Sequence, residues 1–81
     1  MSERIVREYI YFVRVPFNGK TSKWGVVNKR YGDVLGGILW YSGWRQYVFE
    51  AVDGCVFSRG CLDDIGAFIG ELMAARQGVL I

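Results

Sequence analysis

The chain has 81 residues, of which 52% are hydrophobic, 16% aromatic and 22% charged, with a formal net charge of +2. This length predicts one domain, residues 1–81, without room for a large enclosed active site, and the hydrophobic content excludes intrinsic disorder. No apolar run approaches the roughly 20 residues that cross a bilayer, and the N-terminal residues lack a signal-peptide pattern. These features predict a cytoplasmic protein that does not bind membranes.

The sequence contains no histidine and two cysteines, Cys55 and Cys61. The missing histidine excludes Ser-His and Cys-His nucleophilic systems and removes a usual zinc ligand. The adjacent carboxylates Asp63 and Asp64 lie where a helix is predicted to begin, and there they complement the helix dipole. We therefore predict no catalytic residue, no metal site and no cofactor, and a Cys55–Cys61 disulfide stays open.

Charge is distributed unevenly along the chain. Residues 1–40 carry seven basic and three acidic side chains, a net +4, whereas residues 41–81 carry three basic and five acidic ones, a net −2. This pattern indicates a basic sheet face and an acidic helix face, which would suit nucleic acid or an acidic protein surface. Ordinary solvated charge would produce the same pattern.

Four segments have the composition of β-strands. Residues 4–15 are rich in β-branched and aromatic types and end at Pro16, which cannot donate to a strand ladder. Turn signals then separate strands predicted at 23–29, 34–41 and 44–52, and an Asp-Gly pair makes 55–57 a candidate for a short fifth strand. The sequence therefore predicts an antiparallel meander of about four strands.

Apolar residues recur at helical spacing from Gly60 onward, with Asp63 and Asp64 in the first turn, Arg76 in the last and Gly78 just beyond. This periodicity predicts one amphipathic C-terminal helix packed on one face of the sheet. The fold class is therefore α+β, a two-layer sandwich. The periodic residues are Leu62, Ile65, Phe68, Ile69, Leu72 and Met73.

Residues 40–47 hold four aromatic rings and an arginine, on both sides of a Ser-Gly pair that predicts a two-residue hairpin turn. Such a turn places Trp40 opposite Arg45 on the face that alternation assigns to the core. Arg45 then either stacks on Trp40 as a cation–π pair or stays free to bind a phosphate or a carboxylate. The same face carries Ile38, Tyr47, Phe49 and Ala51.

The opposite face of this hairpin is also apolar, which predicts an interface. The two-residue turn pairs Tyr41 with Trp44 on this face, where two large rings would suit contact with a partner. Gly36 and Gly37 leave room for a close neighbour, and we expect Trp24 or a helix residue to cover them. The other residues of this face are Leu35, Leu39, Gln46, Val48 and Glu50.

The spacing of apolar residues from Trp24 onward resembles a known group of proteins. The pattern continues with Leu35-Gly36-x-Ile38-x-Trp40-Tyr41-x-x-Trp44-Arg45-x-Tyr47-x-Phe49, then Val56-Phe57, then Cys61-Leu62-x-x-Ile65-x-x-Phe68. It is similar to small proteins encoded by bacteriophages and prophages, and it covers about residues 24–73. The resemblance implies a phage or mobile-element setting and brings no catalytic or binding residues with it.

A small phage-type domain without catalytic groups is expected to act by binding and not as an enzyme. The first hypothesis is docking on a host protein or ribonucleoprotein complex in the host cytoplasm, for example a defence complex such as a CRISPR effector, with inhibition as the result. The residues predicted to make this contact are Tyr41, Trp44, Arg45 and Gln46.

A second hypothesis is nucleic-acid binding. Three strands followed by a helix, with basic residues around the second strand, is the element order of the sheet-reading DNA-binding domains of some integrases and plant transcription factors. The residues predicted to contact phosphates are Lys20, Lys23, Lys29 and Arg30. A third hypothesis is a homodimeric structural or virion accessory protein that uses the second sheet face.

Overall fold

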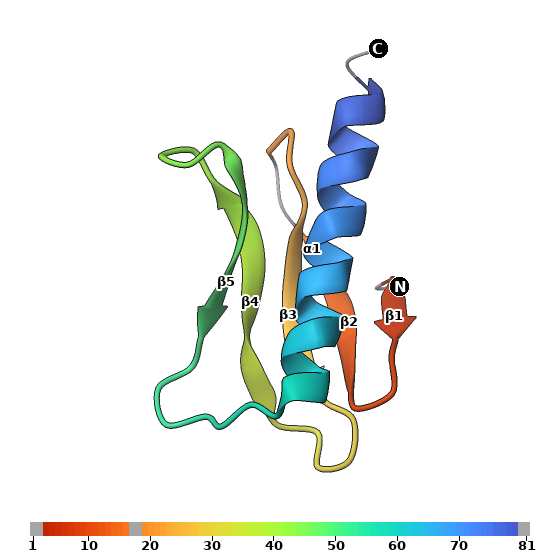
Figure 1. Cartoon of the computed structure of the whole chain (residues 1–81), viewed down its shortest axis with the longest axis vertical. Helices are drawn as coiled ribbons and strands as arrows, with labels where there is room; N and C mark the ends of the chain where they lie inside the picture. The colour runs from red at the N-terminus through yellow and green to blue at the C-terminus, as the bar shows by residue number, and fades with distance from the viewer. Residues whose placement is uncertain (1–2, 17–18, 80–81) are drawn as a thin grey trace.

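The computed structural model describes residues 3–16 and 19–79 and contains one five-stranded sheet with one helix packed on it (Figure 1). The strands follow one another across the sheet in chain order, and every neighbouring pair is antiparallel. The predicted α+β fold class is confirmed. The elements are β1 (Arg4–Val6), β2 (Ile10–Val15), β3 (Lys23–Asn28), β4 (Val34–Tyr41), β5 (Gln46–Ala51) and α1 (Arg59–Val79).

The N-terminal run that the composition predicts as one strand folds as a hairpin of β1 and β2. The Arg7 amide donates to the Ile10 carbonyl at 2.9 Å, which leaves Glu8 and Tyr9 as a two-residue turn. Neither is a usual turn residue, so the pattern carries no sign of a break. The fifth strand therefore comes from the N-terminal region, whereas residues 55–57 have no regular secondary structure.

The helix α1 begins directly after Ser58, whose hydroxyl accepts the Cys61 amide at 3.2 Å as an N-cap. This start places Asp63 and Asp64 in the second turn and not in the first turn, where the periodicity predicts them. The helix also runs to Val79, one residue past the glycine expected to end it. Within the described residues, no helix is both long enough and apolar enough to cross a membrane.

The core lies between α1 and one face of the sheet. Phe68 of α1 stacks on Phe12 of β2 with ring centroids 4.2 Å apart, and meets Trp24 of β3 edge-on at 5.0 Å. Figure 1 shows α1 lying in front of β2 and β3, as these contacts require. The buried residues of this core are Ile10, Phe12, Trp24, Val26, Leu35, Ile38, Tyr47, Ile65 and Phe68, whereas Val27 is buried on the opposite face of the sheet.

Two buried aromatic residues carry polar atoms, and one serine satisfies both. Trp24 Nε1 donates to Ser22 Oγ at 2.8 Å, and the Ser22 amide donates to Tyr47 Oη at 3.1 Å. Leaving such a buried group unpaired would cost about 1–3 kcal/mol. These bonds tie the start of β3 to β5 across β4, and the burial of Tyr47 confirms its predicted place in the core.

A β-bulge changes the faces of β4. The pairing of β3 with β4 shifts register between Val26 and Val27, and Leu35 turns into the core, where it is 5% exposed. Its predicted place on the opposite face is therefore wrong. A Cβ atom on Gly36 would lie 2.7 Å from the Phe49 ring, so Phe49 covers this glycine in place of Trp24 or a helix residue.

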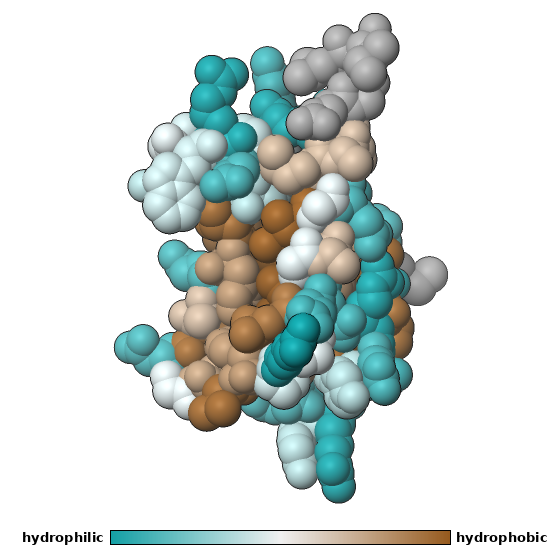
Figure 2. Space-filling model, viewed as in Figure 1, coloured by the Kyte–Doolittle hydropathy of each residue, from teal (hydrophilic) through white to brown (hydrophobic). Residues whose placement is uncertain are grey.

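The helix leaves part of its own side of the sheet uncovered. Figure 2 shows apolar side chains gathered between α1 and the β5 side of the sheet. In this region Phe49 and Phe57 form an edge-on pair 5.3 Å apart, and Leu62 at the start of α1 is exposed. Phe49 and Phe57 are partly buried against the core, so they extend it toward β5.

Candidate functional site

The β4–β5 hairpin ends in a four-residue loop, residues 42–45, and not in the two-residue turn that the Ser-Gly pair predicts. Tyr41 pairs with Gln46, and the Trp44 amide donates to the Tyr41 carbonyl at 3.2 Å. The register is thus displaced by two residues from the prediction. Because side chains alternate with a period of two, Tyr47 and Phe49 keep the face that was predicted for them.

Two aromatic rings stand exposed at this tip. Tyr41 and Trp44 form an edge-on pair with centroids 5.1 Å apart and planes at 78°. Tyr41 is 46% exposed and Trp44 is 68% exposed, so neither ring serves the core. The pair is a preformed aromatic surface at the end of a paired hairpin, and it is the candidate site.

Arg45 completes the tip from a strained backbone position. Its φ of 54° is the one positive value at a described non-glycine residue. Its side chain is exposed and has no ion-pair partner among the residues that the structure describes. The guanidinium is therefore free to bind, and the adjacent Gln46 is exposed as well.

Of the two roles that the sequence leaves open for Arg45, stacking on Trp40 is wrong. Arg76 near the end of α1 lies over the Trp40 ring at 4.1 Å, and Tyr47 meets the same ring edge-on at 5.4 Å. The longer loop carries Arg45 beyond the last strand pair, so it cannot reach Trp40 as a cross-strand neighbour. The cation–π contact thus joins helix to sheet.

Gly43 supports the tip in a way that sequence reasoning missed. A Cβ atom at this position would lie 2.9 Å from Tyr41 Cε2, so the Tyr41 ring rests against the glycine backbone. The glycine predicts a turn, but the sequence does not indicate that an aromatic ring packs against it. Its absent side chain makes room for the ring.

The four basic residues predicted to contact nucleic acid do not form one patch. Lys20 and Lys23 lie before and at the start of β3, whereas Lys29 and Arg30 follow its end. Lys29 lies six positions after Lys23, a distance of about 20 Å along an extended strand. Lys29 is also engaged, because its Nζ donates to the Arg7 carbonyl at 3.2 Å.

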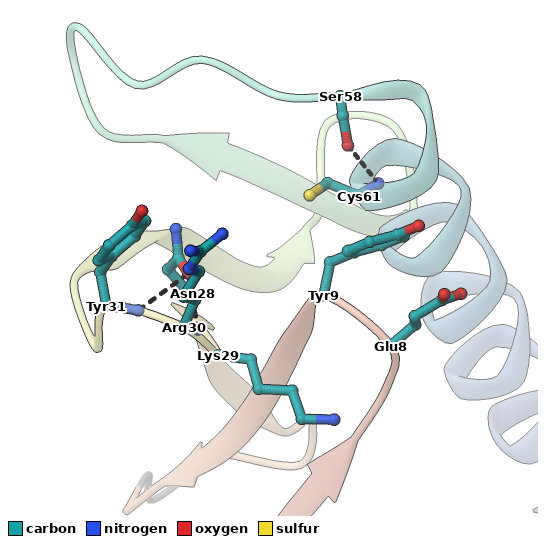
Figure 3. A pocket seen from close by; sticks show the side chains of 8 residues that line it. All are labelled: Glu8, Tyr9, Asn28, Lys29, Arg30, Tyr31, Ser58 and Cys61. Carbon is teal, nitrogen blue, oxygen red and sulfur yellow. Dashed lines mark hydrogen bonds between the residues drawn. The ribbon is translucent and has the colours of Figure 1, made fainter.

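An open depression of about 620 Å³ lies between the β1–β2 turn, the β3–β4 turn and the start of α1 (Figure 3). The negative charge of Glu8 is the main cause that raises the pKa of the Tyr9 phenol above its ordinary value. Cys61 lies on the wall of the depression as a free thiol. Cys55, which does not line the depression, is also a free thiol. The other lining residues are Asn28, Lys29, Arg30, Tyr31 and Ser58.

The polar side chains around the depression do not gather as metal ligands, and one of them is engaged in its own turn. Among residues 3–16 and 19–79, no three His, Cys, Asp or Glu side chains gather as metal ligands would. Asn28 is occupied by its own turn, because its Oδ1 accepts the amides of Arg30 and Tyr31 at 2.9 and 3.2 Å. The hairpin tip is therefore the stronger candidate for a functional site.

The fold and the site define a small α+β domain whose distinctive feature is an exposed aromatic hairpin tip. No family model and no solved structure matches the chain. The chain is 37% identical over 71 residues to the "Uncharacterized 9.3 kDa protein" of Acholeplasma phage L2, and the match covers 86% of this chain and 91% of that protein. The chain therefore belongs to the family of this small phage protein, in line with the phage setting that the resemblance implies.

Proposed function

We propose that this protein is a non-enzymatic phage binding protein that docks on a host protein or ribonucleoprotein complex in the host cytoplasm and inhibits a defence system such as a CRISPR effector. The single observation that carries the proposal is the exposed Tyr41–Trp44 pair at the end of the β4–β5 hairpin. The phage relative supports the setting.

The composition of the tip matches what protein interfaces use for affinity. Trp, Tyr and Arg are the residue types enriched among interface residues whose loss costs 2 kcal/mol or more, at least about 30-fold in affinity. Trp44 and Tyr41 also hold each other edge-on, so little side-chain freedom is lost on binding. A preformed aromatic pair flanked by a free guanidinium suits an apolar pocket with an acidic rim.

The backbone at Arg45 is a second, independent support. A left-handed conformation costs a non-glycine residue roughly 1–2 kcal/mol, and glycine would remove this cost. Strain of this kind gathers at functional sites when the side chain is needed. The presence of an arginine at this position, where glycine would be free of strain, favours a role for its side chain in binding.

Nucleic-acid binding is the alternative function, supported by the exposed basic residues at the two ends of β3. Because these residues are far apart, they do not form one continuous site for phosphates, and the aromatic tip is the better-supported binding site. Under this alternative, DNA binding near 50 mM salt should weaken steeply as salt rises and on the double change Lys23→Ala with Lys29→Ala, in a fluorescence anisotropy titration. A flat salt response, or no binding, would rule it out.

The experiment for the proposed function is affinity capture from a DNase-treated host lysate, quantified by mass spectrometry. The parent protein is compared with the double variant Tyr41→Ala with Trp44→Ala. Tyr31→Ala is the matched control, because Tyr31 is a 74% exposed aromatic residue on a different turn. We expect one host complex that the double variant loses and the control keeps. Equal capture by all three folded proteins would contradict the proposal.

A further inference from the structure

We propose that the sheet face opposite α1 binds a second copy of this chain, by an interface that does not depend on the proposed docking function. This face, called the open face below, consists of the strand residues that alternate with the core residues. No described residue packs over it as α1 packs over the other face (Figure 1). The members that set the packing are Arg4, Tyr11, Lys23, Gly25, Gly37 and Glu50.

The open face is apolar, and its area is to be compared with the area that a protein–protein interface buries. It carries valines on all five strands, and only three of its residues are charged. The chain exposes 5899 Å² in total. A folded monomer of this mass is expected to expose about 4,900 Å², so roughly 1,000 Å² is in excess. A standard interface buries about 800 Å² on each partner, so the excess, summed over the whole surface, is of the size that one interface would cover.

The strand register sets two opposite charges at the two edges of this face. Arg4 pairs with Val13, Val13 with Gly25, Gly25 with Gly37, and Gly37 with Glu50, so these residues form one row across the sheet. The row has a cation on edge strand β1, an anion on edge strand β5, and two glycines near its middle. The Arg4 guanidinium also lies over the Tyr11 ring at 4.4 Å, which confirms that both side chains share this face.

This charged row selects how two copies pack. A two-fold axis parallel to the strands, along β3, places β1 of one copy opposite β5 of the other. Arg4 then faces Glu50 of the second copy, and the same pair forms twice. An axis perpendicular to the strands would instead place Arg4 opposite its own copy and Glu50 opposite its own copy, which like-charge repulsion disfavours.

The middle of the row allows the two sheets to approach. Gly25 and Gly37 present no side chain near the axis, so the valines of the neighbouring rows can meet at the usual separation of about 10 Å between packed sheets. Lys23 is the third charge, and in this arrangement it faces its own copy. Because Lys23 is exposed at the end of β3, its long stem can carry the ammonium to solvent. Replacement Lys23→Met should therefore tighten the dimer.

The test is sedimentation velocity of the purified full chain from about 1 to 500 µM at low salt. For the parent we expect a monomer–dimer equilibrium with a dissociation constant in the micromolar range, about what a small apolar interface gives. Arg4→Glu alone and Glu50→Lys alone should each raise this constant at least about tenfold, because each creates two like-charge pairs. Arg59→Glu, a charge reversal at an exposed site on α1, is the matched control and should leave it unchanged.

An equimolar mixture of the two single variants gives the sharpest outcome. In the mixed dimer, the glutamate introduced by Arg4→Glu faces the lysine introduced by Glu50→Lys. The native Glu50 of the first variant faces the native Arg4 of the second, so both pairs are restored. We expect association within about threefold of the parent, a result that also proves both variants folded.

Two results would overturn the dimer proposal. The first is a parent that stays monomeric at 500 µM, as it would if a different protein covered this face. The second is a mixture that associates no more tightly than the single variants alone, because the restored charge pairs would then have no effect on assembly.

Discussion

At the scale of single residues, one substitution at Arg45 should change stability and partner binding in opposite directions. Replacement Arg45→Gly relieves the positive φ and should raise the free energy of unfolding by about 1 kcal/mol, or the Tm by about 4–8 °C. The same change removes the guanidinium and should weaken docking. Urea unfolding checks the first effect, with Arg45→Ala as the control that keeps the strained backbone. A glycine variant no more stable than the alanine variant would show that φ 54° carries no cost.

At the scale of elements, replacement of a glycine by alanine should lower the free energy of unfolding on the sheet and raise it on the helix. Gly36→Ala drives a methyl group into the Phe49 ring and the Glu50 carbonyl, and should destabilise the protein by about 1–3 kcal/mol. Gly66→Ala on an exposed turn of α1 meets no atom within 4 Å and should stabilise by about 0.5–1 kcal/mol. Thermal unfolding of both variants checks this. A Gly36→Ala variant as stable as the parent would contradict the packing described for Gly36, and a loss of stability on Gly66→Ala would contradict the open space at Gly66.

The elements also show how far the sequence predicts this fold. Strand composition and helical periodicity were enough for the antiparallel meander and α1, because burial of one apolar face dominates both. The break between β1 and β2 carried no signal, since Glu8 and Tyr9 turn the chain without glycine, asparagine or proline. The bulge that buries Leu35 depends on pairing between strands, which no local pattern encodes.

The candidate site was predictable in its residues and not in its geometry. Four aromatic rings near one turn identified the hairpin, but loop length decides which of them the strands pair. The real loop of four residues moved Trp44 and Arg45 out of the strands and gave Trp40 a helix partner, Arg76. That contact joins residues far apart in the chain, so only the packed structure shows it.

At the scale of the whole molecule, the two proposed surfaces meet at Tyr41 and Gln46, which lie on the open face and at the hairpin tip. One sheet face and α1 form the core, the open face is proposed for a second copy, and the hairpin tip is proposed for the host partner. An axis parallel to the strands would direct both tips of a dimer toward the same end. If the docking proposal holds, two linked tips would raise avidity for a partner with repeated sites.

The most direct measurement of the docking proposal is a titration of the captured host complex with purified protein, by calorimetry or surface plasmon resonance. We predict that Trp44→Ala weakens binding at least about 30-fold, as loss of a central aromatic anchor does, and that Tyr31→Ala stays within about twofold of the parent. Both variants should keep the parent's far-ultraviolet spectrum and unfolding midpoint. Equal affinities for parent and Trp44→Ala, with the fold intact, would contradict the account.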